Sequence, residues 1–182
     1  MNHRRIIAVI VAVALATSLI LNLYFYLYVR VQNENIVNNM MVRALASYGG
    51  QISTIEYFFS EYLGTKNTSL LVHEASWCAY NAQSAADACR QGSDEEIYNQ
   101  LWKTAFALQG FGSYYVPEGG TINETKINIV ISSLDHIWRF FFGFDMLKDV
   151  DPLESMTQVN GANATATVIY YCQIAQDNLP RF

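Results

Sequence analysis

An apolar stretch from Ile6 to Val29 constrains this chain more than any other feature. It contains no charged residue, and its polar interruptions are Thr17, Ser18 and Asn22. At 1.5 Å per residue, these 24 residues form a helix of about 36 Å, long enough to cross the roughly 30 Å hydrocarbon core of a bilayer. The sequence therefore predicts one membrane-spanning helix over residues 6–30.

A cleaved signal peptide is the alternative interpretation of this stretch. Arg4 and Arg5 precede it, and Ala14-Leu15-Ala16 matches a small-x-small cleavage site. However, the apolar run continues well beyond Ala16, whereas the apolar part of a signal peptide is usually 7–15 residues long. The far end also carries the aromatic residues that favour a membrane interface. These features favour an uncleaved signal-anchor.

The distribution of charge predicts the orientation of the chain. Residues 1–5 form a short basic tail, which the positive-inside rule places in the cytoplasm. Residues 31–182 then form one extracytoplasmic domain of a single-pass protein in the cell membrane. Asn67, Asn123 and Asn163 each begin an N-x-S/T sequon and are candidate glycosylation sites.

Charge and composition exclude some classes of partner for the domain. Eight of the eleven basic residues and all sixteen acidic residues lie beyond residue 30, so the domain carries a net charge of about −8. A nucleic acid partner is not expected, because binding phosphates requires a basic surface. The aromatic content of 14% is too high for a disordered segment.

Apolar residues beyond the anchor recur at alternating steps of three and four, which predicts packed helices. The first helix continues out of the membrane through residues 32–39, meets Gly49-Gly50, and stops at Gly64. A second helix runs from about Thr68 to Arg90 with a seam of small residues. The three buried seams are expected to be Met41, Leu45, Tyr48, Ile52, Ile55, Phe59 and Tyr62; Leu71, Ala75, Cys78, Ala82, Ala85 and Cys89; and Ile97, Leu101, Ala105, Leu108 and Phe111.

Helix-capping patterns mark the later elements. Ser93 and Glu96 form one capping box, and Thr121 and Glu124 form another, separated from the third helix by a loop over residues 112–120. The fourth helix should bury Ile127, Val130, Leu134, Ile137 and Phe141, with Trp138 and Phe142 widening its face. Asp151-Pro152 should open a short helix that ends near Asn160-Gly161.

The last segment, from Thr165 to Asp177, is open to two interpretations. Val168, Cys172, Ala175 and Leu179 fit a helical seam, although many of its residues favour strands. A helix is the better prediction, because a lone strand would have no partner.

The predicted fold class is therefore all-α: an N-terminal transmembrane helix followed by an antiparallel, up-down-up-down bundle with a short fifth helix. In architecture alone, this arrangement is similar to the four-helix sensor domains of bacterial and archaeal chemoreceptors. No shared motif accompanies the similarity, and architecture by itself implies no function.

No catalytic pattern stands out, so an enzyme is not expected. The sequence has no nucleophile turn, phosphate-binding loop or dinucleotide fingerprint. His73-Glu74 and Asp135-His136 are the pairs closest to a metal or acid–base site, but they lack the spacing of a zinc site and should lie far apart in the bundle. No metal and no cofactor are predicted.

The three cysteines suggest one disulfide if the domain lies in an oxidising compartment. Cys78 and Cys89 would be held about 16 Å apart by eleven residues of one helix, too far for a bond. Cys172 is therefore the shared candidate, pairing with Cys78 or Cys89. Three reduced cysteines acting as small core residues are the alternative.

An aromatic cluster at the end of the fourth helix has more surface than one seam can bury. Trp138, Phe140, Phe142 and Phe144 form a candidate interaction surface. This surface favours a protein-interaction or structural module that binds a partner protein or forms a homo-oligomer. The alternative is a small-molecule-binding sensor that acts with a signalling partner and holds its ligand along the alanine seam of the second helix.

Overall fold

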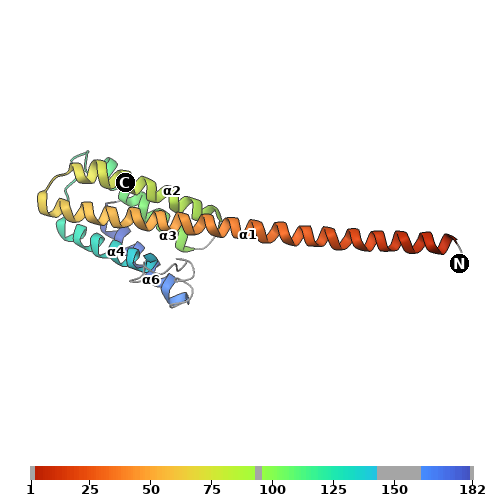
Figure 1. The fold of residues 1–182 in the computed structure, drawn as a ribbon. Helices are drawn as coiled ribbons and strands as arrows, with labels where there is room; N and C mark the ends of the chain where they lie inside the picture. Colours follow the sequence, from red (N-terminus) through yellow and green to blue (C-terminus); the bar gives the residue numbers. More distant parts are fainter. Residues whose placement is uncertain (1–2, 93–95, 143–160, 181–182) are drawn as a thin grey trace. The chain divides into compact units, whose positions relative to one another are not determined.

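The computed structural model describes residues 3–92, 96–142 and 161–180, and within these ranges it contains helices and turns but no strand. This confirms the all-α prediction (Figure 1). The chain divides into two units, 1–39 and 40–182, and α1 contributes residues to both. The elements are α1 (His3–Thr65), the π-helical turn η1 (Leu70–Ala75), α2 (Ser76–Gly92), α3 (Glu96–Gly110), the π-helical turn η2 (Phe111–Tyr115), α4 (Glu124–Phe142) and α6 (Gly161–Asn178).

The first unit is a single helix whose described side chains, from residue 13 onward, are all exposed. In the described part of the chain, α1 provides the one helical stretch that is long and apolar enough to span a membrane. The Thr17 hydroxyl donates to the Val13 carbonyl over 2.8 Å, so this polar group is satisfied within the helix. Arg30 pairs with Glu34 over 2.9 Å.

The second unit is a bundle built around the remainder of α1, residues 40–65. In Figure 1 this part of α1 runs between α2 and α4. All seven residues of its predicted seam are buried, and so are all members of the third-helix seam. In the small seam of α2, Ala85 is only half-buried and its neighbour Ala86 is buried instead. Four of the five predicted residues of α4 are buried, while the side chain of Phe141 lies outside the described residues.

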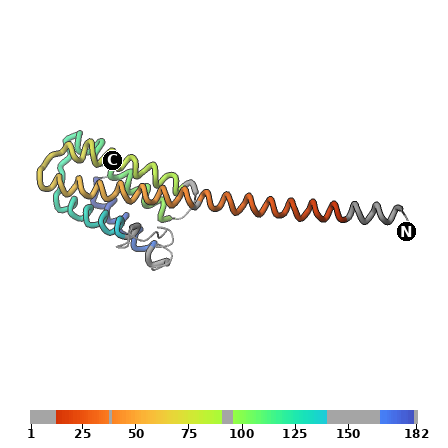
Figure 2. Tube along the Cα trace, in the orientation of Figure 1, coloured from red at the N-terminus to blue at the C-terminus, as the bar shows by residue number. Residues whose placement is uncertain are grey.

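Contacts between the helices show that successive helices run in opposite directions (Figure 2). At one end of the bundle, the Cys89 thiol of α2 faces the Met41 carbonyl of α1, with 3.8 Å between sulfur and oxygen. At the other end, Phe59 of α1 packs on Phe111, with ring centroids 5.8 Å apart. There Lys66 also pairs with Glu124, the first residue of α4, over 2.6 Å. The predicted antiparallel bundle is therefore confirmed.

A polar ladder joins α3 to α6 inside this bundle. The Gln176 amide donates to the Thr104 hydroxyl over 2.9 Å and to the Gln100 side-chain oxygen over 3.1 Å. The Tyr48 hydroxyl of α1 donates to the Leu101 carbonyl over 3.0 Å. Among the described residues, no buried side-chain nitrogen or oxygen lacks a hydrogen-bond partner. Because an unsatisfied buried polar group costs free energy, these bonds define the register of the three helices.

Two predicted helix boundaries are wrong by a short distance. α1 ends at Thr65 rather than at Gly64, and Lys66 adopts the left-handed conformation (φ 58°) with its amide bonded to the Tyr62 carbonyl. At α4, Asn123 caps the helix: its side-chain oxygen accepts from the Lys126 amide over 3.1 Å, so the predicted box that began at Thr121 is not formed. In both cases a neighbouring residue with suitable geometry satisfies the helix end.

Two other sequence predictions concern the middle and the end of the chain. The expected loop over residues 112–120 is partly helical, because η2 continues the third helix to Tyr115. The C-terminal segment is the helix α6, and Val168, Cys172, Ala175 and Leu179 are all buried, which confirms the favoured interpretation. The Ser93 capping box and the short helix after Asp151-Pro152 lie outside the described residues.

Candidate functional site

Two π-helical turns pack directly against each other in the bundle. η1 precedes α2 and η2 follows α3, and the two turns contact each other where α2 and α3 pack. Gly112 of η2 lies so close to η1 that an added Cβ would collide with the Leu71 carbonyl oxygen and stand 2.8 Å from the Ser76 Cβ. Only glycine allows this approach. π-Helical turns are rare and occur frequently at functional sites.

Two serines hold the junction of the π-turns together. The Ser76 hydroxyl donates to the Val72 carbonyl over 2.8 Å, and the Ser113 hydroxyl donates to the Ser76 oxygen over 3.2 Å. Both side chains are half-buried. The hydrogen bonds link the start of α2 to η2 and leave a polar surface between them.

An open cleft of about 460 Å³ lies over this junction. Trp77 is 65% exposed and Tyr80 is 51% exposed, and their rings stack with centroids 6.1 Å apart. The lining residues come from η1, α2, α3 and η2, and they are Val72, His73, Glu74, Ser76, Trp77, Tyr80, Gln109 and Ser113.

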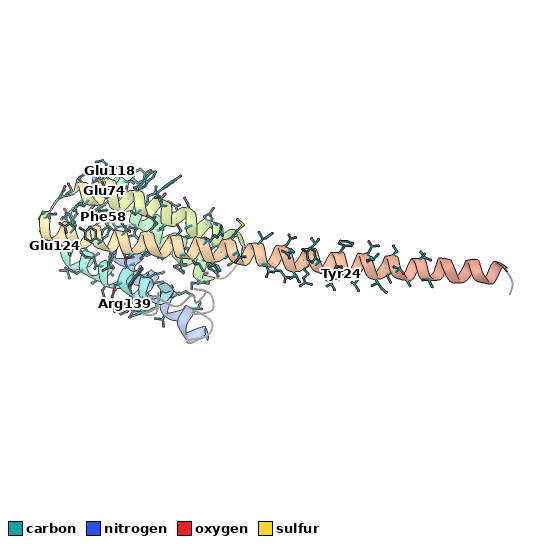
Figure 3. The ribbon with its side chains drawn as sticks, in the orientation of Figure 1. Tyr24, Phe58, Glu74, Glu118, Glu124 and Arg139 are labelled. Atoms are coloured by element: carbon teal, nitrogen blue, oxygen red, sulfur yellow. The ribbon has the colours of Figure 1, made fainter. Side chains whose placement is uncertain are left out.

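Glu74 supplies the negative charge of the cleft. Its side chain is exposed, and Figure 3 shows it on the outside of the bundle, on the same side as Glu118. Among the described residues, Glu74 forms no salt bridge, and no lysine or arginine lines the cleft. Burial, and secondarily the charge of Glu74, raise the pKa of the Cys78 thiol one turn further along the helix. Glu74 therefore acts electrostatically on its surroundings without an opposing charge.

The two histidine pairs of the sequence lie in different environments. His73 lines the cleft, whereas the His136 ring packs on Tyr171 with centroids 4.2 Å apart. The Nδ1 atom of His136 lies 2.8 Å from the Ser132 carbonyl oxygen, which makes that nitrogen the donor. In the described part of the chain, no three His, Cys, Asp or Glu side chains are grouped so that they could hold a metal ion. The structure thus brings neither pair together with further ligands.

The predicted disulfide is not formed. Cys78, Cys89 and Cys172 are all free and buried. Cys89 faces the backbone of α1, and Cys172 lies on α6 beside Thr104 and Tyr48, so each thiol fills a separate part of the core. Burial raises the pKa of Cys89 to about 11 and that of Cys172 to about 12. The alternative interpretation, three reduced core cysteines, describes the structure.

The other predicted site residues are only partly described. Trp138 is half-buried and packs on the core, while the side chains of Phe140 and Phe142 and the whole of Phe144 lie outside the described residues. Asn67 and Asn123 are exposed, which is compatible with glycosylation; the side chain of Asn163 lies outside the described residues. The interaction surface and the sugar sites therefore stay predictions.

The sequence interpretation missed the cleft because a π-turn has no hydrophobic period of its own. The ligand expected along the alanine seam stays a prediction; of the alanines in that seam, Ala75 and Ala82 are buried in the core and Ala85 is half-buried. The available signal was the pair Trp77 and Tyr80, which fall off the small seam of α2 and lie within six residues of His73-Glu74.

No family model matches the chain, and no curated protein and no solved structure is found to be similar to it.

Proposed function

We propose that this chain is a single-pass, membrane-anchored helical bundle that binds a partner protein or a second copy of itself. The observation that carries the proposal is the contrast between two sets of apolar side chains. Those of the bundle are packed into one core, whereas those of residues 13–37 are exposed along a single helix. An apolar helix of this length requires a bilayer, because water does not solvate it favourably.

The chemistry of the first unit supports the anchor. In hydrocarbon every backbone polar group must be satisfied internally, as a helix does, and Thr17 satisfies its hydroxyl in the same way. The rings of Tyr24 and Tyr28 stack near the end of the apolar stretch, with centroids 6.3 Å apart. Amphipathic rings favour the headgroup region. Charged residues appear next, at Arg30 and Glu34.

The proposed orientation has the N-terminus in the cytoplasm and the bundle outside it. Arg4 and Arg5 support this through the positive-inside rule, and exposed sequons at Asn67 and Asn123 are compatible with it. Expression in a eukaryotic secretory pathway tests the orientation. A mobility shift is expected that is removed by endoglycosidase and by the combined variant Asn67→Gln, Asn123→Gln, Asn163→Gln, whereas a bundle facing the cytoplasm would give no shift.

The interaction role rests on aromatic rings that the core does not use. Aromatic side chains outside the core are typical anchors of protein interfaces. The described examples, each at least half exposed, come from every helix of the bundle except α4, and they are Tyr57, Trp77, Tyr80, Phe106, Tyr114 and Tyr170.

Native mass spectrometry of the full chain, released from nanodiscs made with its source lipids, tests the proposal. The expected result is a defined oligomer or a stoichiometric partner that co-purifies with the chain. The same sample should remain in the membrane pellet after alkaline carbonate extraction. A strictly monomeric chain without a partner, or a chain released by carbonate, would contradict the proposal.

A further inference from the structure

The cleft at the π-helical junction combines one carboxylate with two aromatic ring faces. Glu74 lies on η1, and Trp77 and Tyr80 follow within the first two turns of α2. Both side chains are more than half exposed, and because the two rings stack on each other, the outer face of each ring is the one open to solvent. A negatively charged group beside the π-faces of Trp and Tyr is the environment that stabilises an organic cation.

The remaining lining residues exclude other ligand classes. Glu74 disfavours an anion, because in the part of the chain that the structure describes no lysine or arginine lines the cleft and His73 is the one lining residue able to carry a positive charge. A metal ion lacks a third ligand among the described residues. A purely apolar ligand would remove water from the side-chain amide of Gln109, although the hydroxyls of Ser76 and Ser113 already donate to Val72 and Ser76.

We propose that this cleft binds an organic ammonium group, preferably a quaternary amine such as that of choline. The methyl groups of such an ion are weakly hydrated and contact ring faces favourably, while Glu74 neutralises the charge. The cleft volume of about 460 Å³ leaves room for a tail beyond the ammonium group. The Gln109 amide lines the same cleft and is available to donate to a hydroxyl or ester on that tail, whereas the Ser113 oxygen is available only to accept from a hydroxyl, because its proton is donated to Ser76.

The backbone around the cleft is held before a ligand arrives. Gly112 allows the two π-turns to touch, and the Ser113–Ser76 hydrogen bond joins them. Trp77 and Tyr80 therefore project from a helix whose start is bonded to η2. A preorganised site binds more tightly, because less conformational entropy is lost on binding. This ligand role goes beyond the proposed partner binding. It uses Trp77 and Tyr80, so the partner interface would then rest on the other exposed rings.

The test uses the full chain in nanodiscs of phosphatidylglycerol, with the intrinsic fluorescence of Trp77 as readout. The variant Trp102→Phe, Trp138→Phe removes the other two tryptophans, and its circular dichroism must match that of the natural chain. Choline chloride is titrated at constant ionic strength. The neutral isostere 3,3-dimethylbutan-1-ol, in which carbon replaces the charged nitrogen, is the ligand control.

Saturable quenching by choline, with at least about fivefold weaker binding of the neutral isostere, is the expected result. Glu74→Gln should weaken choline binding by a similar factor, whereas Glu118→Gln, on the same side of the bundle, should change it less than twofold. Equal binding of choline and its isostere would overturn the proposal. An unchanged affinity in Glu74→Gln, or quenching that never saturates, would do the same.

Glycerophosphocholine, the soluble headgroup of phosphatidylcholine, distinguishes the source of the ammonium group. If a lipid headgroup is the natural ligand, glycerophosphocholine should bind at least about fivefold more tightly than choline. If a free ligand is natural, it should bind more weakly than choline, because Glu74 repels its phosphate. Either result supports an ammonium site, and the absence of saturable quenching by both compounds contradicts it.

Discussion

The two units of this protein differ in the exposure of their apolar side chains, which are exposed in the first unit and packed into a core in the second. In the first unit the apolar residues surround the helix on every side, and all described side chains from residue 13 to residue 37 are exposed. In the second unit α1 carries an apolar stripe at steps of three and four, and that stripe is buried by the other helices. The comparison teaches that the pattern, rather than the amount, of apolar residues decides whether a helix needs a bilayer or a protein core.

Truncating the same residue type in each unit should give the largest contrast. Phe59→Ala removes a ring that is 1% exposed and contacts Phe111, so it should lower the free energy of unfolding of the bundle by about 3–5 kcal/mol. Phe25→Ala, on the same helix but exposed, should change it by less than about 0.5 kcal/mol. Denaturation of the full chain in detergent, followed by circular dichroism, measures both. Equal effects would mean that the two units share one core.

The reactivity of the three thiols should depend on how deeply each is buried in the bundle. Because burial raises the pKa of Cys172 to about 12, its thiolate fraction near pH 8 should be about a thousandfold lower than that of an unfolded cysteine. The folded state then holds its thiol protons more tightly than the unfolded state. The contribution of the protonated Cys172 thiol to the free energy of unfolding is therefore fully present below about pH 8.5, and it is lost as the pH rises from there toward 12.

Alkylation with iodoacetamide, followed by peptide mapping, checks this expectation. Cys78, which is 9% exposed, should react first, while Cys89 and Cys172, both 0% exposed, react only after unfolding. A disulfide that includes Cys172 in the isolated protein would show that the bundle is packed differently.

The close approach of the two π-turns should be sensitive to the addition of one methyl group. Gly112→Ala places a Cβ against the Leu71 carbonyl and should destabilise the bundle by about 1–3 kcal/mol. Gly50→Ala is the matched control, because its Cβ meets nothing within 4 Å and alanine favours the helix. The control should be neutral or stabilising by up to about 1 kcal/mol. Two identical effects would contradict the described contact between η1 and η2.

A smaller effect tests how α4 begins. Asn123→Ala removes the side chain that accepts from the Lys126 amide and should cost about 1 kcal/mol. Thr121→Ala should cost almost nothing, since the backbone carbonyl of Thr121, rather than its side chain, accepts the bond from Tyr115. Thermal unfolding of both variants measures the difference. A larger loss of stability in Thr121→Ala than in Asn123→Ala would show that Thr121, rather than Asn123, caps α4.

The sequence was sufficient to predict the helices and most of the core. Leu45, Ile52, Leu101 and Val130 lie on seams whose spacing matches helix packing, so their burial follows from periodicity alone. Helix ends were less predictable, because several nearby residues can satisfy the same orphan amide or carbonyl. Asn123 competes with Thr121 in this way, and Lys66 takes a left-handed conformation that glycine normally favours.

The candidate site was beyond such reasoning for a different reason. A π-turn shifts the helix by one residue without a characteristic residue type, so the sequence does not reveal that Gly112 touches Leu71. The cleft depends on that contact, which joins residues far apart in the chain. The positions of Trp77 and Tyr80 outside the seam were visible in the sequence, but the polar surface beside them was not.

Hydrogen–deuterium exchange of the full chain in nanodiscs is the direct test of the proposed membrane anchor. The helix of residues 13–37 has no tertiary packing of its own unit to protect it, so in water its amides would exchange quickly. The account predicts that amides between Leu15 and Tyr28 are protected for hours in nanodiscs, as strongly as those between Leu45 and Tyr62, because lipid excludes water from the first segment and the core excludes it from the second. Exchange of the first segment within seconds, while the second stays protected, would contradict the membrane anchor.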